Sequence, residues 1–192
     1  MCAEDRTDDR SQRERMLAGD LYIAGDPQLA EEYQRAMRLM EQFNGSPAAD
    51  PGERRRLLEE LLGHIGEGTE IRPPLYVDYG HQISVGARTF VNFGLTALDV
   101  AAITIGDDVQ IGPHVQLLTP THPVDPSLRQ AKWEAAAPIV IRDGVWLGGG
   151  CIVLPGVAIG PNTVVGAGAV VTRDLPANVV AVGNPARVVR HL

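Results

Sequence analysis

The chain has 192 residues, of which 44% are hydrophobic and 21% are charged, and its formal net charge at neutral pH is −7. This composition is typical of a folded, water-soluble protein, and no stretch approaches the ~20 apolar residues that a membrane span needs. The negative charge argues against a dedicated nucleic-acid binder, because phosphate backbones attract basic surfaces.

Residues 1–12 are rich in charged side chains and contain no apolar run, so we expect a disordered tail and no signal peptide. The two cysteines are Cys2 in this tail and Cys151 in a run of small residues, and we expect no structural disulfide between them. This cysteine usage favours a reducing, cytoplasmic location.

Residues 13–66 are predicted to form a helical segment. Asp26-Pro27 and Asp50-Pro51 each place a capping side chain before a proline suited to a first helical turn, and Asn44-Gly45 supplies a stop. Apolar residues recur at helical spacing after each start. They are Leu29, Tyr33, Ala36, Met37, Met40 and Phe43 in the first helix, and Leu57, Leu58, Leu61 and Leu62 in the second.

From residue 71 onward, apolar residues recur every six positions, and many are followed by glycine. The register slips by two residues after Ile83 and again between Ala97 and Ile105, so the repeats fall in groups of three. Three such repeats make one coil with three flat faces, in which each apolar residue stacks on one a coil away. An antiparallel sheet would show alternation with period two, which we do not find. The sequence therefore predicts a mainly β fold, a parallel β-helix over residues 67–192. The repeated positions are Ile71, Val77, Ile83, Val85, Val91, Ala97, Ile105, Ile111, Leu117, Ile141, Leu147, Val153, Ile159, Val165 and Val171.

Residues 123–140 interrupt this repeat. Ile141 follows Leu117 by 24 positions, which is a multiple of six, so the coils are expected to resume in the same register. A long excursion from a rigid scaffold is a candidate functional loop. His122 stands at its root.

Several segments, in this order, resemble the hexapeptide-repeat acetyltransferases, specifically the maltose, galactoside and nodulation O-acetyltransferase branch. They include MLAGDLYIAGDPQL (16–29), FVNFGLTALDV (90–100), IGPHVQLLTPTHPVD (111–125) and VWLGGGCIVLPGVAIG (145–160). The resemblance implies a left-handed parallel β-helix, a homotrimer, and transfer of an acetyl group from acetyl-CoA to a hydroxyl of a small acceptor without a metal. The left hand follows only from the resemblance, because parallel crossovers are ordinarily right-handed.

The resemblance also implies the residues of the site. His122 matches the catalytic histidine, and an imidazole suits general-base removal of a hydroxyl proton at neutral pH. Asn92 and Asp78 match acceptor-site positions, and Tyr22 and Asp26 belong to an N-terminal motif expected to close that site. The residues alone leave two other interpretations open, in which His122 caps a turn and Asn92 satisfies turn backbone inside the coils.

For the donor, Gly149 lies in a run of three glycines that allows the pantetheine arm to approach backbone amides. Ala167 and Thr172 match positions along the cofactor groove. Arg187 and Arg190 match basic residues at the nucleotide end, where guanidinium groups suit phosphates. Their alternative interpretation is a solvated C-terminal tail.

Three other functions use the same residues. A zinc-dependent hydratase of the γ-carbonic-anhydrase type would need His81, His114 and His122 as ligands, although their spacing differs from that family. A covalent acyl route would use Cys151. A non-catalytic trimeric scaffold would be expected to have lost His122. Sugars, sugar derivatives and xenobiotic alcohols all remain open as acceptors.

Overall fold

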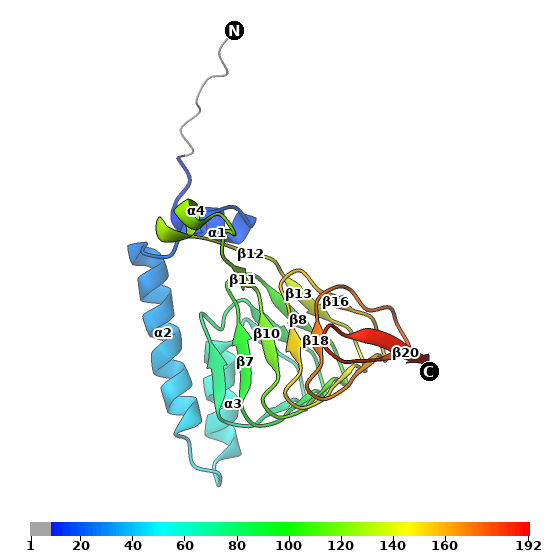
Figure 1. Ribbon diagram of the computed structural model, residues 1–192. Helices are drawn as coiled ribbons and strands as arrows, with labels where there is room; N and C mark the ends of the chain where they lie inside the picture. Colours follow the sequence, from blue (N-terminus) through cyan, green and yellow to red (C-terminus); the bar gives the residue numbers. More distant parts are fainter. Residues whose placement is uncertain (1–8) are drawn as a thin grey trace.

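The computed structural model describes residues 9–192, and most of the chain winds into a three-sided prism of short parallel strands (Figure 1). Sheet 1 contains β2 (His64–Ile65), β5 (Ile83–Val85), β8 (Ile103–Ile105), β13 (Ile139–Ile141) and β16 (Ala158–Ile159). Sheet 2 contains β3 (Glu70–Ile71), β6 (Phe90–Val91), β9 (Gln110–Ile111), β14 (Trp146–Leu147), β17 (Val164–Val165) and β19 (Val179–Val182), and β20 (Arg187–His191) joins it antiparallel. Sheet 3 contains β4 (Leu75–Val77), β7 (Leu95–Leu98), β10 (Gln116–Leu118), β15 (Ile152–Val153) and β18 (Val170–Val171).

The predicted stacking of apolar residues is confirmed by the strand register. In sheet 2, Val91 pairs with Ile111, and Ile111 pairs in turn with Leu147. All three side chains are buried. Such a column forms because each strand is short, so one apolar residue per strand turns inward and meets the equivalent residue a coil away.

The first coil begins earlier than the repeat predicted. Ile65 pairs with Val85, so this coil runs through Ile65, Ile71 and Val77, and the prism starts at β2 rather than at residue 67. The expectation that Ile83 closes the first group of three is wrong. Ile83 and Val85 lie on the same strand and are both buried, because alternate residues of a strand share one face.

The departures from the six-residue period up to Ile141 fall at one edge of the prism, where sheet 3 passes to sheet 1. Here the chain is longer in three successive coils, at residues 78–82, 99–102 and 119–138. We call these three segments the insertion corner. Because the coils are stacked in register, the longer turns lie beside one another and supply enough chain to form a cavity.

Helices cover the open end of the first coil (Figure 1). α2 (Pro27–Asn44) and α3 (Pro51–Leu61) begin after Asp26 and Asp50, as predicted, and α2 ends at Gly45. The Asp26 carboxylate accepts hydrogen bonds from the backbone N–H groups of Gln28 and Leu29, at 2.9 and 3.2 Å. The buried faces of the two helices join the apolar core of the prism, so helices and coils form one core.

The first described helix is α1 (Gln12–Ala18), and the Ser11 side chain caps it. Helical structure therefore begins at the last residue of the segment 1–12 that we expected to be disordered. Residues 1–8 of that segment lie outside the described residues. None of the described helices is both long and apolar enough to cross a bilayer.

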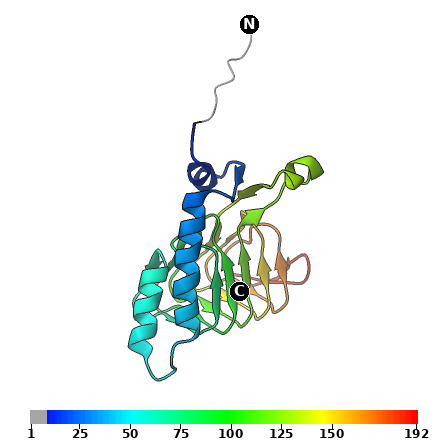
Figure 2. The same cartoon turned by 90° about the vertical axis from the view of Figure 1, so that its left-hand side faces the viewer.

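The excursion folds back onto the N-terminal segment of its own chain. After β11 (Pro120–Thr121) and α4 (Pro126–Gln130), strand β12 (Trp133–Ala136) lies between β11 and β1 (Tyr22–Ile23) in a small antiparallel sheet. α4 extends away from the prism at the tip of the excursion (Figure 2). The coils resume at β13, with Ile141 in register with Ile105, as the 24-residue spacing predicted.

Candidate active site

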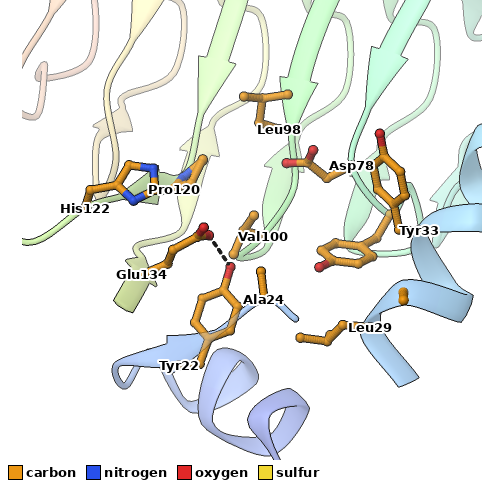
Figure 3. A pocket seen from close by; sticks show the side chains of 12 residues that line it. Tyr22, Ala24, Leu29, Tyr33, Asp78, Leu98, Val100, Pro120, His122 and Glu134 are labelled. Atoms are coloured by element: carbon orange, nitrogen blue, oxygen red, sulfur yellow. Dashed lines mark hydrogen bonds between the residues drawn. The ribbon is translucent and has the colours of Figure 1, made fainter. Parts of the chain in front are cut away.

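A pocket of about 460 Å³ opens between the insertion corner and the N-terminal helical segment (Figure 3). Its walls come from β1 and the residues after it, from α2, from the turns of the insertion corner and from the excursion. Six of the lining residues carry a polar group, three of them tyrosines, and the other six are aliphatic. The lining residues are Tyr22, Ala24, Leu29, Ala30, Tyr33, Asp78, Tyr79, Leu98, Val100, Pro120, His122 and Glu134.

His122 follows β11 directly and is exposed at the pocket. The pairing of Thr121 with Ala135 anchors the chain immediately before it. The His122 imidazole makes no hydrogen bond to any residue of 9–192, so both ring nitrogens are available to a ligand.

Glu134 is a pocket residue that the sequence analysis did not identify. The hydroxyl of Tyr22, which is only 1% exposed, donates a hydrogen bond to Glu134 Oε2 at 3.0 Å. Burial raises the pKa of Tyr22, and the Glu134 charge raises it further, so the hydroxyl remains a donor at neutral pH. A signal for Glu134 existed, because it is the sole carboxylate between residues 126 and 142.

Asp78 lines the pocket because buried Asp99 holds its turn. The Asp99 carboxylate accepts hydrogen bonds from the backbone N–H groups of Asp78 at 3.0 Å, Tyr79 at 2.9 Å and Gln82 at 3.3 Å. Burial raises the pKa of Asp99 to about 6, although these hydrogen bonds oppose the shift. Burial also raises the pKa of Asp78, and the charge of Glu134 adds to it. Asp99 was not predicted from the sequence.

Asp26 does not line the pocket. Its carboxylate is engaged with the first turn of α2, so the structure gives it a capping function rather than a contact with an acceptor. Of the four residues expected at the acceptor site, Tyr22 and Asp78 line the same pocket as His122, and Asp26 is not among the lining residues.

Asn92, the fourth of these residues, lies at a different edge of the prism. The turns that pass from sheet 2 to sheet 3 occupy residues 92–94, 112–115, 148–151 and 166–169, and we call them the glycine corner. A hollow of about 290 Å³ there is lined by Asn92, Trp146 and Gly149, among others. The Asn92 side-chain oxygen accepts a hydrogen bond from the Phe93 N–H at 2.8 Å, so this oxygen is engaged with turn backbone.

Gly149 and Ala167 lie on successive coils of the glycine corner. The Gly168 N–H donates to the Gly149 carbonyl at 3.0 Å, which holds the two turns together. The N–H groups of Gly149 and Ala167 donate to no residue among 9–192, so two free amides lie one strand spacing apart, about 4.8 Å. A Cβ on Gly148 would come within 2.4 Å of the Ala167 nitrogen, so this close stacking requires glycine there.

The other expected donor residues are divided between two edges. Thr172 follows β18 and is exposed at the edge that carries the insertion corner, away from Gly149 and Ala167. Arg187 pairs with Val182 and Arg190 pairs with Val180, across a β-bulge between Val180 and Ala181. This bulge places two arginines that are three residues apart on the same face of β20.

The residues proposed for other chemistries do not come together. His81 lies beside Glu32, with 3.7 Å between Nε2 and Oε2, whereas His114 belongs to the glycine corner. In residues 9–192 no three His, Cys, Asp or Glu side chains are placed to hold a metal ion. Cys151 is fully buried, and burial raises the pKa of its thiol to about 12. Cys2 lies outside the described residues.

The comparisons with known proteins agree with one another. The model of the maltose acetyltransferase hexapeptide capping motif matches residues 15–66, and that of the bacterial transferase hexapeptide (six repeats) matches residues 138–173. Nodulation protein L of Rhizobium meliloti is 48% identical over 180 residues, which covers 93% of this chain and 98% of that protein.

Two solved structures extend this likeness to the whole fold. The maltose O-acetyltransferase of Clostridium difficile superposes with a TM-score of 0.94 at 41% identity, over 95% of this chain and 98% of that one. A Vibrio cholerae hexapeptide-repeat acetyltransferase in complex with acetyl-CoA superposes with a TM-score of 0.89 at 39% identity, over 95% and 99% of the two chains. With its coiled prism, its helical cap and these relatives, the chain belongs to the hexapeptide-repeat acetyltransferase family.

Proposed function

We propose that this protein is an acetyl-CoA-dependent O-acetyltransferase that acetylates a hydroxyl of a sugar or similar small acceptor, with His122 as the general base. The observation that carries the proposal is that His122 is exposed at the edge of the pocket and its imidazole makes no hydrogen bond within residues 9–192. The names of the relatives supply the donor and the acceptor class: one solved relative holds acetyl-CoA and another is a maltose O-acetyltransferase.

The proposed reaction is a direct transfer. The His122 imidazole takes the hydroxyl proton as the acceptor oxygen attacks the thioester carbonyl carbon. The C–S bond then breaks, and the imidazolium returns the proton to the departing CoA sulfur. No covalent acyl-enzyme is required, which agrees with the burial of Cys151.

The donor is expected to lie along the glycine corner. The free N–H groups of Gly149 and Ala167 suit the amide carbonyls of a pantetheine arm. Arg187 and Arg190, which share one face of β20, suit the phosphates at the nucleotide end. Thr172 would contact the same donor only if it belonged to a neighbouring chain, because it lies at another edge of the prism.

This division is the main argument for a homotrimer. Asn92 and His122 lie at two different edges of the prism, so one chain does not bring them to a single acceptor. Three prisms packed around an axis place the glycine corner of one chain against the insertion corner of the next. Exposed apolar side chains support such contacts: Val124 on the insertion corner is 93% exposed, Phe93 on the glycine corner is 49%, and Trp146 on the neighbouring strand β14 is 55%.

Release of CoA from acetyl-CoA, measured against glucosides, galactosides, maltose and chloramphenicol, tests the proposal. We expect turnover with at least one sugar, and an O-acetyl ester in the product by NMR. Chloramphenicol as the only good acceptor would instead favour a xenobiotic acetyltransferase, which the aliphatic half of the pocket could serve. Hydrolysis without transfer, or loss of turnover on metal chelation with recovery on added zinc, would refute the proposal.

A further inference from the structure

The charged groups of the acceptor pocket are of one sign. Two carboxylates line it, Asp78 and Glu134, and a third, Asp99, lies directly behind Asp78. No lysine or arginine is among the lining residues, and His122 is the sole lining group able to carry a positive charge. The groups that this chain contributes therefore make the potential inside the pocket more negative, and low-dielectric walls strengthen their effect.

These carboxylates have few hydrogen-bond partners. Glu134 accepts one hydrogen bond, from the Tyr22 hydroxyl, and the Asp78 carboxylate accepts none from residues 9–192. A carboxylate offers about four acceptor positions, so most of the hydrogen-bonding capacity of the pair is free. A partly buried carboxylate without a full set of donors is poorly solvated. A ligand that supplies the missing donors therefore gains more binding free energy there than at a fully solvated carboxylate.

We propose that the natural acceptor carries a protonated amine near the hydroxyl that is acetylated, as an amino sugar does, and that Asp78 and Glu134 bind this amine. The inference rests on the proposed O-acetyltransferase function and names the acceptor class of the same site. An ammonium group has three donors and no acceptor, which matches a pair of carboxylates that lack donors. The aliphatic wall formed by Leu29, Leu98 and Val100 suits the C–H face of a sugar ring.

A neutral sugar would also donate hydroxyl hydrogen bonds to these carboxylates, so the test must separate charge from shape. Methyl 2-amino-2-deoxyglucoside, methyl glucoside and methyl glucoside 2-sulfate differ only at C2, where they carry a positive, a zero or a negative charge. We expect kcat/KM to fall in that order, with the amino sugar favoured over the neutral sugar by about tenfold or more, because charge-assisted hydrogen bonds are roughly twice as strong as neutral ones. NMR must locate the new acetyl group on oxygen.

The isosteric variants Glu134→Gln and Asp78→Asn test which residues create the preference. Each should lower the ratio of kcat/KM for the amino sugar to that for the neutral sugar several-fold. Glu41→Gln is the matched control, because Glu41 is exposed at the far end of α2 and does not line the pocket, so the ratio should not change. If a variant fails to fold, the wild-type protein still gives an answer, since added salt should weaken selection of the amino sugar and not of the neutral one.

Equal kcat/KM values for the amino and neutral sugars would overturn this inference and leave the O-acetyltransferase proposal intact. A preference for the amino sugar that survives both variants would also overturn it, because the selecting charge would then lie elsewhere. Turnover of none of the three sugars and of no other alcohol would refute the proposed function, and this inference with it.

Discussion

Asp99 lies one layer behind the pocket wall, and its hydrogen bonds to the 78–82 turn decide where Asp78 points. The Tyr22 hydroxyl, on the adjacent strand β1, holds the Glu134 carboxylate directly. Buried neighbours thus hold the backbone of Asp78 and the side chain of Glu134, whereas the pairing of β11 with β12 holds the backbone before His122. Positioning of this kind matters to catalysis, because small displacements of reacting groups cost large factors in rate.

His122→Ala tests the role of the histidine. Loss of a positioned general base should lower kcat by about 10²–10⁴, since a sugar hydroxyl is too weak an acid to ionise unaided. Acetyl-CoA binding, measured by calorimetry, should be retained because the donor residues lie at another edge. His64→Ala, at an exposed position on sheet 1, is the control and should keep the wild-type kcat. Near-normal kcat in His122→Ala would contradict the base assignment.

The pKa of Asp99 predicts a pH dependence of stability. Because its pKa rises from 3.8 in the unfolded chain to about 6 in the fold, the native state binds more protons between these two values. The free energy of unfolding should therefore fall as pH rises through this window, by up to about 3 kcal/mol from Asp99. In Asp99→Asn this component is absent. Urea unfolding of both proteins at pH 4.5 to 7 measures the difference, and parallel curves would contradict the prediction.

Among the elements, β20 shows how a local irregularity creates a binding face. Arg187 and Arg190 are three positions apart and would point to opposite faces of a regular strand. The β-bulge restores them to one face, beside the last coil of sheet 2. The strand is therefore more than a closing edge, because it gathers two positive charges at the end of the glycine corner.

The double variant Arg187→Ala with Arg190→Ala should raise the KM for acetyl-CoA and leave the acceptor KM nearly unchanged. Each lost charge-assisted contact costs roughly 1.5–3 kcal/mol, so the combined rise should exceed about 100-fold if both bind phosphate. Arg38→Ala, at an exposed site on α2, serves as the control. An unchanged donor KM in the double variant would make the two arginines ordinary surface residues.

Local rules predicted most of these elements. The Asp-Pro starts located α2 and α3, and the six-residue period located the inward residues of nearly every coil. The period failed at Ile83, where two inward residues share one strand. It also contained no information on the hand of the coils, or on which turns would meet. Glu134 and Asp99 were missed because both act through contacts between segments that are distant in sequence.

For the whole molecule, the prediction is a trimer with shared active sites. Light scattering should give a mass of about 62 kDa, three times the 20.6 kDa of one chain. In a mixture of His122→Ala and Asn92→Ala subunits, about a quarter of the sites formed between neighbours would contain both native residues. The activity of the two variants unfolded and refolded together should therefore exceed the sum of their separate activities. No recovery in mixed trimers, or an active monomer, would contradict the shared site.

The position of the extra chain has a consequence for how such proteins diversify. The insertions lie along one edge of the prism, while the free amides and β20 lie along another. Lengthening a surface loop costs little, only about 0.6 kcal/mol for each doubling of its length. Loops of new sequence grafted between residues 123 and 138, which leaves His122 in place, would thus change the alcohol that is accepted without altering the stacked framework. Related proteins can therefore keep the same binding site for the acetyl donor while the acceptor that they use changes during evolution.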